Sequence, residues 1–218
     1  MKKSYTIQAL SMTFLLVFFT LRVFSQNAWF NEFHYDNSGT DVGEFLEIVI
    51  ENPGDYDLSQ FTVTLYNGNG GASYASNTVD NFLTTTTVGN YTIYYWDVVI
   101  QNGSPDGFSL DYQGNILQFL SYEGSFVATN GPANGMISTD IGVSEGSSTP
   151  EGYSLQLQGT GATYADFTWA GPIENTEGLV NTGQTIYRIP ETPISNWAIL
   201  IGVLLITMFA YFRFRKAA

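Results

Sequence analysis

The sequence of 218 residues contains no cysteine and only one histidine, His34. Without cysteine no disulfide can form, and a zinc site of the usual kind, which needs several His or Cys ligands, is disfavoured. Between the two ends of the chain, no stretch has apolar residues at the 3.6-residue spacing of a helix. The fold must therefore rely on its own packing, for which the 16% aromatic content supplies large apolar side chains.

Basic residues are also few: the chain has seven Lys and Arg and twenty Asp and Glu. The basic residues are Lys2, Lys3, Arg22, Arg188, Arg213, Arg215 and Lys216. Residues 26–196 contain one of them and all twenty acids, which gives a formal charge of 1 − 20 = −19. A segment with this charge repels phosphate backbones and anionic lipid heads and attracts cations. We therefore predict that the chain has no nucleic-acid partner.

The N-terminus has the pattern of a secretory signal peptide. Lys2 and Lys3 precede an apolar-rich stretch over residues 7–24, and Ser25 is a small residue suited to the position before a cleavage site. The alternative is a permanent N-terminal membrane helix, which Arg22 within the apolar stretch disfavours. We predict a signal peptide over residues 1–25 and hence an exported protein.

The C-terminus has the pattern of a membrane anchor. A Pro-containing linker is predicted over residues 189–196, and residues 197–212 contain no charge. The apolar-rich segment counted from residue 194 is about 19 residues long, and a helix of that length spans roughly 30 Å of hydrocarbon. The basic tail 213–218 would stay in the cytoplasm, so the domain would face outward, at the cell surface or in the periplasm. A buried core helix is the alternative.

Residues 26–188 are predicted to form one all-β domain. Leu46, Ile48 and Ile50 alternate with Glu47 and its neighbours, which predicts a strand with one buried face and Glu47 on the solvent face. Short β-prone runs recur along the segment, and seven or more of them with frequent turn signals are typical of a β-sandwich. These runs are 61–66, 91–100, 108–112, 116–122, 153–157 and 167–169. We expect loops around a short strand at 79–83 within 72–87, a hairpin turn at 113–115, and a long loop over 124–150.

Several motifs in this domain resemble the lamin-tail-like domain of bacterial secreted proteins. They are NEFHYDN at 31–37, GEFLEI at 43–48, DLS at 57–59, LYNGNGG at 65–71, QNGSPDG at 101–107, FLSYEG at 119–124, STDIGV at 138–143 and NTGQ at 181–184. The resemblance covers roughly residues 28–187 and implies an immunoglobulin-like β-sandwich. Domains of this family often accompany secreted nucleases or phosphatases, and this chain has no such catalytic partner.

The C-terminal tail resembles the sorting signals of exosortase-type transpeptidases. Those signals combine a short Pro-containing motif, one membrane helix and a basic cluster. Here the motif would lie at 190–193 or 193–197. The resemblance implies an exosortase-type processing enzyme as a partner.

His34, the one histidine of the chain, is the first candidate for acid–base chemistry. It could meet Glu32 or Asp36, but a Ser-His-Asp site also needs a positioned nucleophile, and no pattern in the sequence marks one. A structural histidine on a strand is the alternative that we favour, and we predict no catalytic residue.

The acidic stretch 36–47 is the candidate for a metal site. Asp36 and Glu47 have the spacing of the first and last ligands of an EF-hand loop, but Asp41 replaces the required glycine and the flanks are strands, which excludes an EF-hand. A looser calcium site formed by Asp36, Asp41 and Glu44 is the one cofactor that the sequence suggests. A solvated acidic turn is the alternative.

The sequence as a whole predicts a non-catalytic binding, adhesion or structural module on the cell surface. We expect it to be exported, tethered to the membrane by the C-terminal helix, and to bind a glycan or an envelope protein. Exposed aromatic residues such as Tyr74, Tyr94 or Trp96 could form a glycan platform, although core positions are the alternative. The competing hypothesis is a secreted hydrolase, or a nuclease-associated domain, with a weak acidic metal site.

Overall fold

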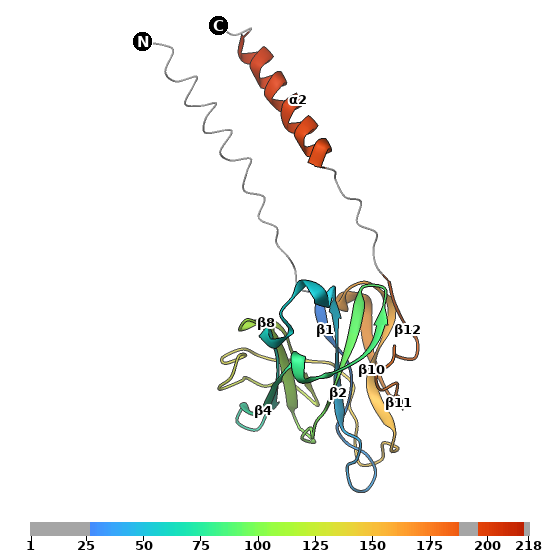
Figure 1. Ribbon diagram of the computed structural model, residues 1–218. Helices are drawn as coiled ribbons and strands as arrows, with labels where there is room; N and C mark the ends of the chain where they lie inside the picture. The colour runs from blue at the N-terminus through green and yellow to red at the C-terminus, as the bar shows by residue number, and fades with distance from the viewer. Residues whose placement is uncertain (1–26, 188–195, 216–218) are drawn as a thin grey trace.

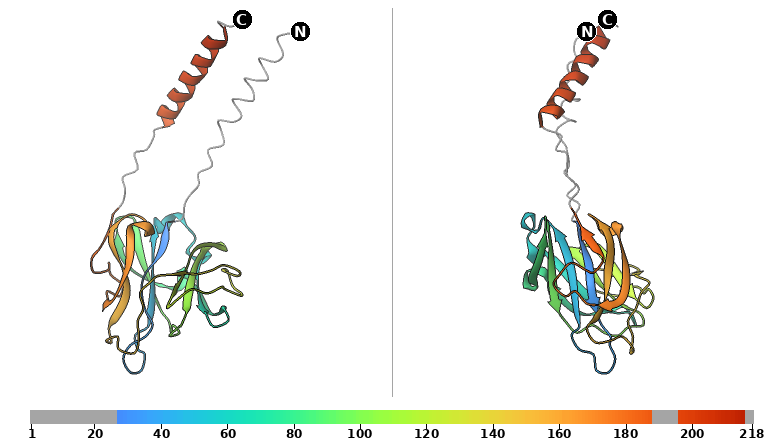
Figure 2. Two further views of the ribbon diagram at one scale, coloured as in Figure 1. Left: turned by 180° about the vertical axis from the view of Figure 1, so that it is seen from behind. Right: turned by 90° about the vertical axis from the view of Figure 1, so that its right-hand side faces the viewer.

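The computed structural model describes residues 27–187 and 196–215. Residues 27–187 form two β-sheets that lie face to face, as Figures 1 and 2 show. This arrangement confirms the β-sandwich that the short alternating strands predict.

The first sheet has seven strands in the order β11-β10-β1-β2-β6-β5, with β12 added to β10. Its strands are β1 (Ala28–His34), β2 (Phe45–Glu51), β5 (Leu83–Val88), β6 (Tyr91–Asp97), β10 (Tyr153–Gly161), β11 (Phe167–Glu174) and β12 (Gln184–Ile186). The second sheet has five strands in the order β4-β3-β7-β8-β9. Its strands are β3 (Phe61–Asn67), β4 (Ala72–Thr78), β7 (Asp106–Tyr112), β8 (Asn115–Tyr122) and β9 (Thr139–Asp140).

Neighbouring strands are mostly antiparallel, and the parallel exceptions are β8–β9 and β10–β12. The turn between β7 and β8 has the predicted hairpin chemistry, because Gln113 and Gly114 both adopt positive φ, at 54° and 77°. Two successive positive φ values give the turn a twist that matches the twist of the flanking strands. Short 3₁₀ turns connect other strands: η1 (Pro53–Asp55), η2 (Leu58–Gln60), η3 (Val79–Asn81) and η4 (Tyr164–Asp166).

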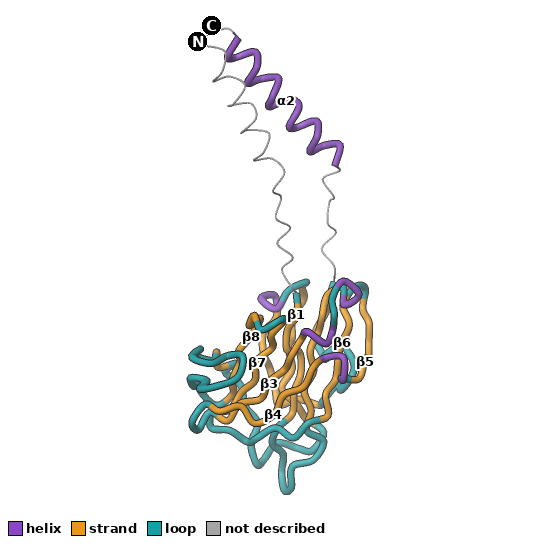
Figure 3. The backbone as a smooth tube through the Cα atoms, turned by 60° about the vertical axis from the view of Figure 1, so that its left-hand side comes forward, coloured by secondary structure: helices purple, strands orange, loops and turns teal. Residues whose placement is uncertain are grey.

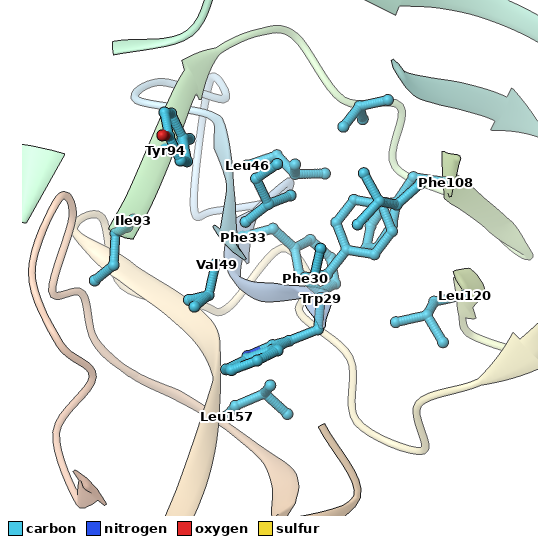
Figure 4. Close-up of a cluster of buried hydrophobic side chains, with 14 of the residues drawn as sticks. Trp29, Phe30, Phe33, Leu46, Val49, Ile93, Tyr94, Phe108, Leu120 and Leu157 are labelled. Atoms are coloured by element: carbon cyan, nitrogen blue, oxygen red, sulfur yellow. The ribbon is translucent and has the colours of Figure 1, made fainter. Parts of the chain in front are cut away.

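The core between the sheets is aromatic. The Phe108 ring on β7 lies 4.4 Å from the Phe30 ring and 4.8 Å from the Phe33 ring, both on β1, measured between centroids. Tyr122 on β8 also contacts Phe33, and all of these side chains are fully buried. Figure 4 shows Phe30, Phe33 and Phe108 side by side. Offset and edge-to-face contacts of this kind replace the covalent cross-links that a chain without cysteine cannot make.

The predicted single buried face of β2 is wrong, because both faces of β1 and β2 are buried. Ile48 is in the core as expected, but Glu47 is also fully buried. The reason is residues 174–181, here called the strap, which cross the outer face of the seven-stranded sheet. Backbone N–H groups of the strap donate to the carboxylates of Glu32 and Glu47. Alternation places Glu47 on the second face correctly, but that face is covered by a distant part of the chain.

The segment 72–87 is also different from its prediction. It contains two strands, β4 and β5, and residues 79–81 form the turn η3 rather than a strand. Both strands lie at sheet edges, and their Ser, Thr and Asn side chains are mainly exposed or half-buried. Edge strands with polar side chains lack the apolar alternation that would predict a strand. The long loop 124–150 is confirmed, and it contains β9 and a bridge between Val127 and Ile137.

The two ends of the sandwich lie close together. The Asn27 side chain donates to the carbonyl of Ala162 (2.7 Å). The Tyr187 N–H donates to the carbonyl of Gly161, the residue before Ala162 (3.0 Å). Figure 3 shows strands in orange and the connecting loops in teal.

The C-terminal segment contains α2 (Asn196–Arg215). No helix in the two described segments is both long enough and apolar enough to cross a membrane, so the predicted span 197–212 is not supported. The predicted signal peptide 1–25, most of the linker 189–196 and the end of the basic tail, 216–218, lie outside the described residues. Asn196 begins α2, and Arg213 and Arg215 lie in its last turn.

Candidate functional site

The lone histidine forms a buried ion pair with a residue on the long loop. His34 Nδ1 lies 2.9 Å and 3.0 Å from the two carboxylate oxygens of Glu145, and both side chains are almost completely buried. His34 Nε2 lies 3.2 Å from Oδ1 of Asn37. The side-chain nitrogen of Asn37, Nδ2, donates to two backbone carbonyls, which orients its Oδ1 toward the histidine. Both ring nitrogens therefore act as donors, as in the cationic form of histidine.

The electrostatics of His34 agree with that assignment. Burial alone lowers its pKa, but the hydrogen bond and the charge of Glu145, together with Asn37, outweigh burial and leave the pKa raised. Glu145 also accepts the backbone N–H of Tyr35 (2.6 Å) and of Asp36 (3.1 Å). The pair thus fastens the long loop to the end of β1. Because both ring nitrogens donate to fixed partners, His34 is not available as a general base.

The sequence-based partners of His34 are wrong. The sequence suggests Glu32 or Asp36, whereas the carboxylate that contacts the ring belongs to Glu145, 111 residues further along. No local pattern connects the two positions, so pairwise contact information would have been needed to find Glu145.

A second buried acidic group lies on the outer face of the seven-stranded sheet. Glu32 and Glu47 are cross-strand partners on β1 and β2, and neither side chain is exposed. Glu32 accepts hydrogen bonds from Ser154 Oγ (2.7 Å), from Gln156 Nε2 (3.2 Å), and from the backbone N–H (2.8 Å) and hydroxyl (2.6 Å) of Thr176. Glu47 accepts from the N–H of Gly178, and its Oε2 has no hydrogen-bond partner among residues 27–187.

The carboxyl groups of Glu32 and Glu47 lie close together in a buried site, where two negative charges would repel each other. Burial, and next the neighbouring Glu32, raise the pKa of Glu47 to about 9. Burial also raises the pKa of Glu32, against the lowering effect of its hydrogen bonds with Thr176 and Ser154. Glu47 therefore holds its proton at neutral pH, as a general acid would. The strap covers it completely, however, and a group without access to solvent cannot reach a substrate.

An amide network holds the strap in place. Asn181 donates to the carbonyls of Asn31 (2.9 Å) and Leu157 (3.0 Å) and accepts from the Asn31 side chain (2.9 Å). Gln184 donates to Oδ1 of Asn31 (2.8 Å). These two residues belong to the motif NTGQ at 181–184, so that motif has a structural role.

The structure does not assemble the calcium candidate of Asp36, Asp41 and Glu44. Asp41 accepts hydrogen bonds from the backbone of Asn37 and the side chain of Asn102, and Glu44 accepts the N–H of Ile100. Burial, and next the nearby Asp41 carboxylate, raise the pKa of Asp36. Within the described segments no group of three or more His, Asp or Glu residues is placed to hold a metal ion. The carboxylates of Asp41 and Glu44 thus accept hydrogen bonds from the protein itself.

A shallow pocket of about 380 Å³ lies beside the His34–Glu145 pair. The long loop, β10 and β11 line it with Ser144, Glu145, Gly146, Ser148, Thr149, Pro150, Tyr153 and Pro172. The loop is fixed by hydrogen bonds between Gly146 and Thr149 and by one from Ser38 N–H to the carbonyl of Thr149 (2.8 Å). The pocket thus combines hydroxyl groups with the apolar surfaces of Tyr153 and two prolines on a preformed backbone.

The pocket is not the aromatic platform that the sequence suggests. Tyr94 is buried, and Tyr74 and Trp96 pack against the core. Sequence reasoning missed Tyr153, although it is the first aromatic residue after the long loop rich in Gly, Ser and Thr.

The chain matches no protein-family model, no curated protein and no solved structure in the three comparisons. The resemblance to lamin-tail-like domains and to exosortase-type tails therefore rests on the sequence motifs alone.

Proposed function

We propose that this protein is an exported, non-catalytic binding module whose pocket at Tyr153 binds an uncharged glycan. The observation that carries the proposal is the lining of the pocket. Ser144 and Ser148 are exposed and carry hydroxyls that can exchange hydrogen bonds with a sugar, and Tyr153 and the prolines offer apolar surface for a sugar face. A volume of about 380 Å³ accommodates a sugar unit rather than a long chain.

Charge restricts the ligand class further. Residues 27–187 contain nineteen acids and no Lys or Arg, a formal charge of 0 − 19 = −19. Anionic ligands such as nucleic acids and phosphorylated sugars would be repelled. The hydrolase or nuclease alternative has no supporting observation, because His34 and Glu47 are buried in structural contacts.

The fold type and location belong to the same proposal. We infer an immunoglobulin-like sandwich of the lamin-tail-like type, supported by the motifs at 31–37 and 181–184, which make the His34 and Asn181 contacts. The signal-peptide pattern supports export. The exposed apolar side chains of α2, such as Leu204, Ile206 and Phe209, support retention of the protein with the cell envelope, where an exosortase-type enzyme could process the tail.

A glycan array probed with the purified protein tests the proposal. Wild-type protein should bind neutral oligosaccharides, and Tyr153→Ala should abolish that binding. The matched control is Tyr187→Ala, because Tyr187 is a 48% exposed tyrosine that does not line the pocket. Binding to acidic glycans only, or equal binding by both variants, would contradict the proposal.

A further inference from the structure

The long loop presents apolar side chains to solvent on the side of the five-stranded sheet. Val127 and Ile137, here called the ridge, are 49% and 69% exposed, and their chain neighbour Met136 is 42% exposed. Val127 and Ile137 form an antiparallel bridge, so their side chains lie next to each other on one side. In Figure 1 the first part of the loop lies on the side of β4 and β8. An apolar group gathered on one loop calls for a partner more strongly than scattered exposed residues do.

The backbone beneath the ridge is fixed. Ala128 and Met136 are joined by a backbone hydrogen bond of 3.0 Å, and Thr129 N–H donates to the carbonyl of Gly71 (2.8 Å). Ala128 and Ala133 of the same loop pack in a small core with Tyr66.

Two glycines make this close packing possible. A Cβ on Gly71 would lie 2.0 Å from the Val127 carbonyl oxygen, and a Cβ on Gly131 would lie 2.6 Å from the Tyr66 hydroxyl. The ridge is therefore presented in one preorganised conformation, which lowers the entropic cost of binding.

Charge indicates the kind of partner. Residues 124–139 contain no charged side chain, but Glu123 and Asp140 flank them, and residues 27–187 contain no Lys or Arg. A second copy of the chain would bring two domains of charge −19 together, and an anionic membrane surface would be repelled in the same way. A protein segment with an apolar anchor between basic residues is attracted by the acids and can bury the ridge.

We propose that the ridge of Val127 and Ile137 docks a protein segment in which apolar side chains are flanked by Lys or Arg. This surface shares no residue with the pocket at Tyr153, so it is a second binding site that goes beyond the proposed glycan site.

Three labelled 12-residue peptides test this inference by fluorescence anisotropy with the purified protein. All carry the same central leucine–phenylalanine–leucine anchor, flanked by lysines, serines or glutamates. The lysine-flanked peptide should bind, the serine-flanked peptide about tenfold more weakly, and the glutamate-flanked peptide not at all. Burial of one exposed aliphatic side chain raises affinity about tenfold. Ile137→Ser should therefore weaken binding of the lysine-flanked peptide by at least that factor.

Two further variants separate docking from general charge attraction. Leu83→Ser removes a 65% exposed leucine on β5 and should leave affinity unchanged. Gly131→Ala keeps both ridge side chains but strains a backbone with φ of 65° and crowds Tyr66, so it should weaken binding in a protein that still unfolds cooperatively.

Several outcomes would overturn the inference. They are equal affinity of wild type and Ile137→Ser, equal losses in Ile137→Ser and Leu83→Ser, and self-association in sedimentation that Ile137→Ser abolishes. Binding to vesicles with anionic lipid through Ile137 would also overturn it. Tyr153→Ala should retain peptide binding, so failure of the glycan site and failure of the ridge are distinguishable.

Discussion

Glu47 illustrates what residue patterns can and cannot predict. Period-two alternation assigns Ile48 to the core and Glu47 to the opposite face, and the structure agrees with both assignments. The pattern carries no information on whether that second face is open. Gly178, whose N–H covers Glu47, lies 131 residues away. Alternation is a local property and burial depends on tertiary contacts, so the protonated carboxyl could not be predicted.

The stability of the domain should fall as pH rises, because Glu47 holds a proton in the folded state. Its folded pKa of about 9 lies above the ordinary 4.5, so its contribution is complete below pH 4.5 and is lost progressively toward pH 9. Glu47→Gln should reduce the slope of the free energy of unfolding against pH by up to about 1.4 kcal/mol per pH unit. The variant should also be more stable than wild type at pH 8.

Urea unfolding at pH 5, 6, 7 and 8 measures this effect. Glu151→Gln, an exposed position, is the matched control for removal of one negative charge. A wild-type free energy of unfolding that is equal at pH 5 and pH 8 would contradict the account.

Loss of His34 should destabilise the fold rather than remove an activity. His34→Ala leaves Glu145 buried without its cationic partner, which typically costs about 3–5 kcal/mol. The contribution of His34 should be largest below pH 6.5, since its raised pKa means that the stabilisation is lost as pH rises through the folded value. Thermal unfolding at pH 6 and pH 8 tests this, and an unchanged melting temperature at pH 6 would refute it.

At the scale of elements, prediction succeeded where apolar alternation or turn chemistry was strong. β2, β3 and the β7–β8 hairpin follow from the sequence, as does the long loop 124–150. β4 and β5 were missed because edge strands rich in Thr and Ser have no buried face to impose a pattern. The strap was missed because, after Glu174 at the end of β11, it contains no helix and no strand, and its order comes from the side chains of Asn31, Asn181 and Gln184.

Release of the strap should expose the buried acids. Asn181→Ala removes two donated hydrogen bonds to backbone carbonyls and one accepted from Asn31, and it should cost about 1–3 kcal/mol for the polar groups left unsatisfied. Amide hydrogen exchange should accelerate in residues 174–181 before it does in the core strands. Thr185→Ala, an exposed neighbour on β12, is the control, and equal exchange in the two variants would show that Asn181 does not hold the strap.

At the scale of the whole molecule, net charge dominates the surface. Within residues 27–187 the only ion pair is His34–Glu145, so most surface carboxylates face one another across solvent without an internal cation. Added salt should screen this repulsion and stabilise the fold. We expect the melting temperature to rise between 20 mM and 300 mM sodium chloride, and equally with choline chloride. A falling melting temperature would contradict this interpretation.

The most direct test of the central claim, binding without catalysis at the Tyr153 pocket, is native mass spectrometry. The purified protein is incubated for a day with neutral cello-, malto-, xylo- and chito-oligosaccharides. The account predicts a complex whose added mass equals that of the intact oligosaccharide, its loss in Tyr153→Ala, and no shortened oligosaccharide in solution. Shortened products that accumulate with folded protein but not with heat-denatured protein would contradict it.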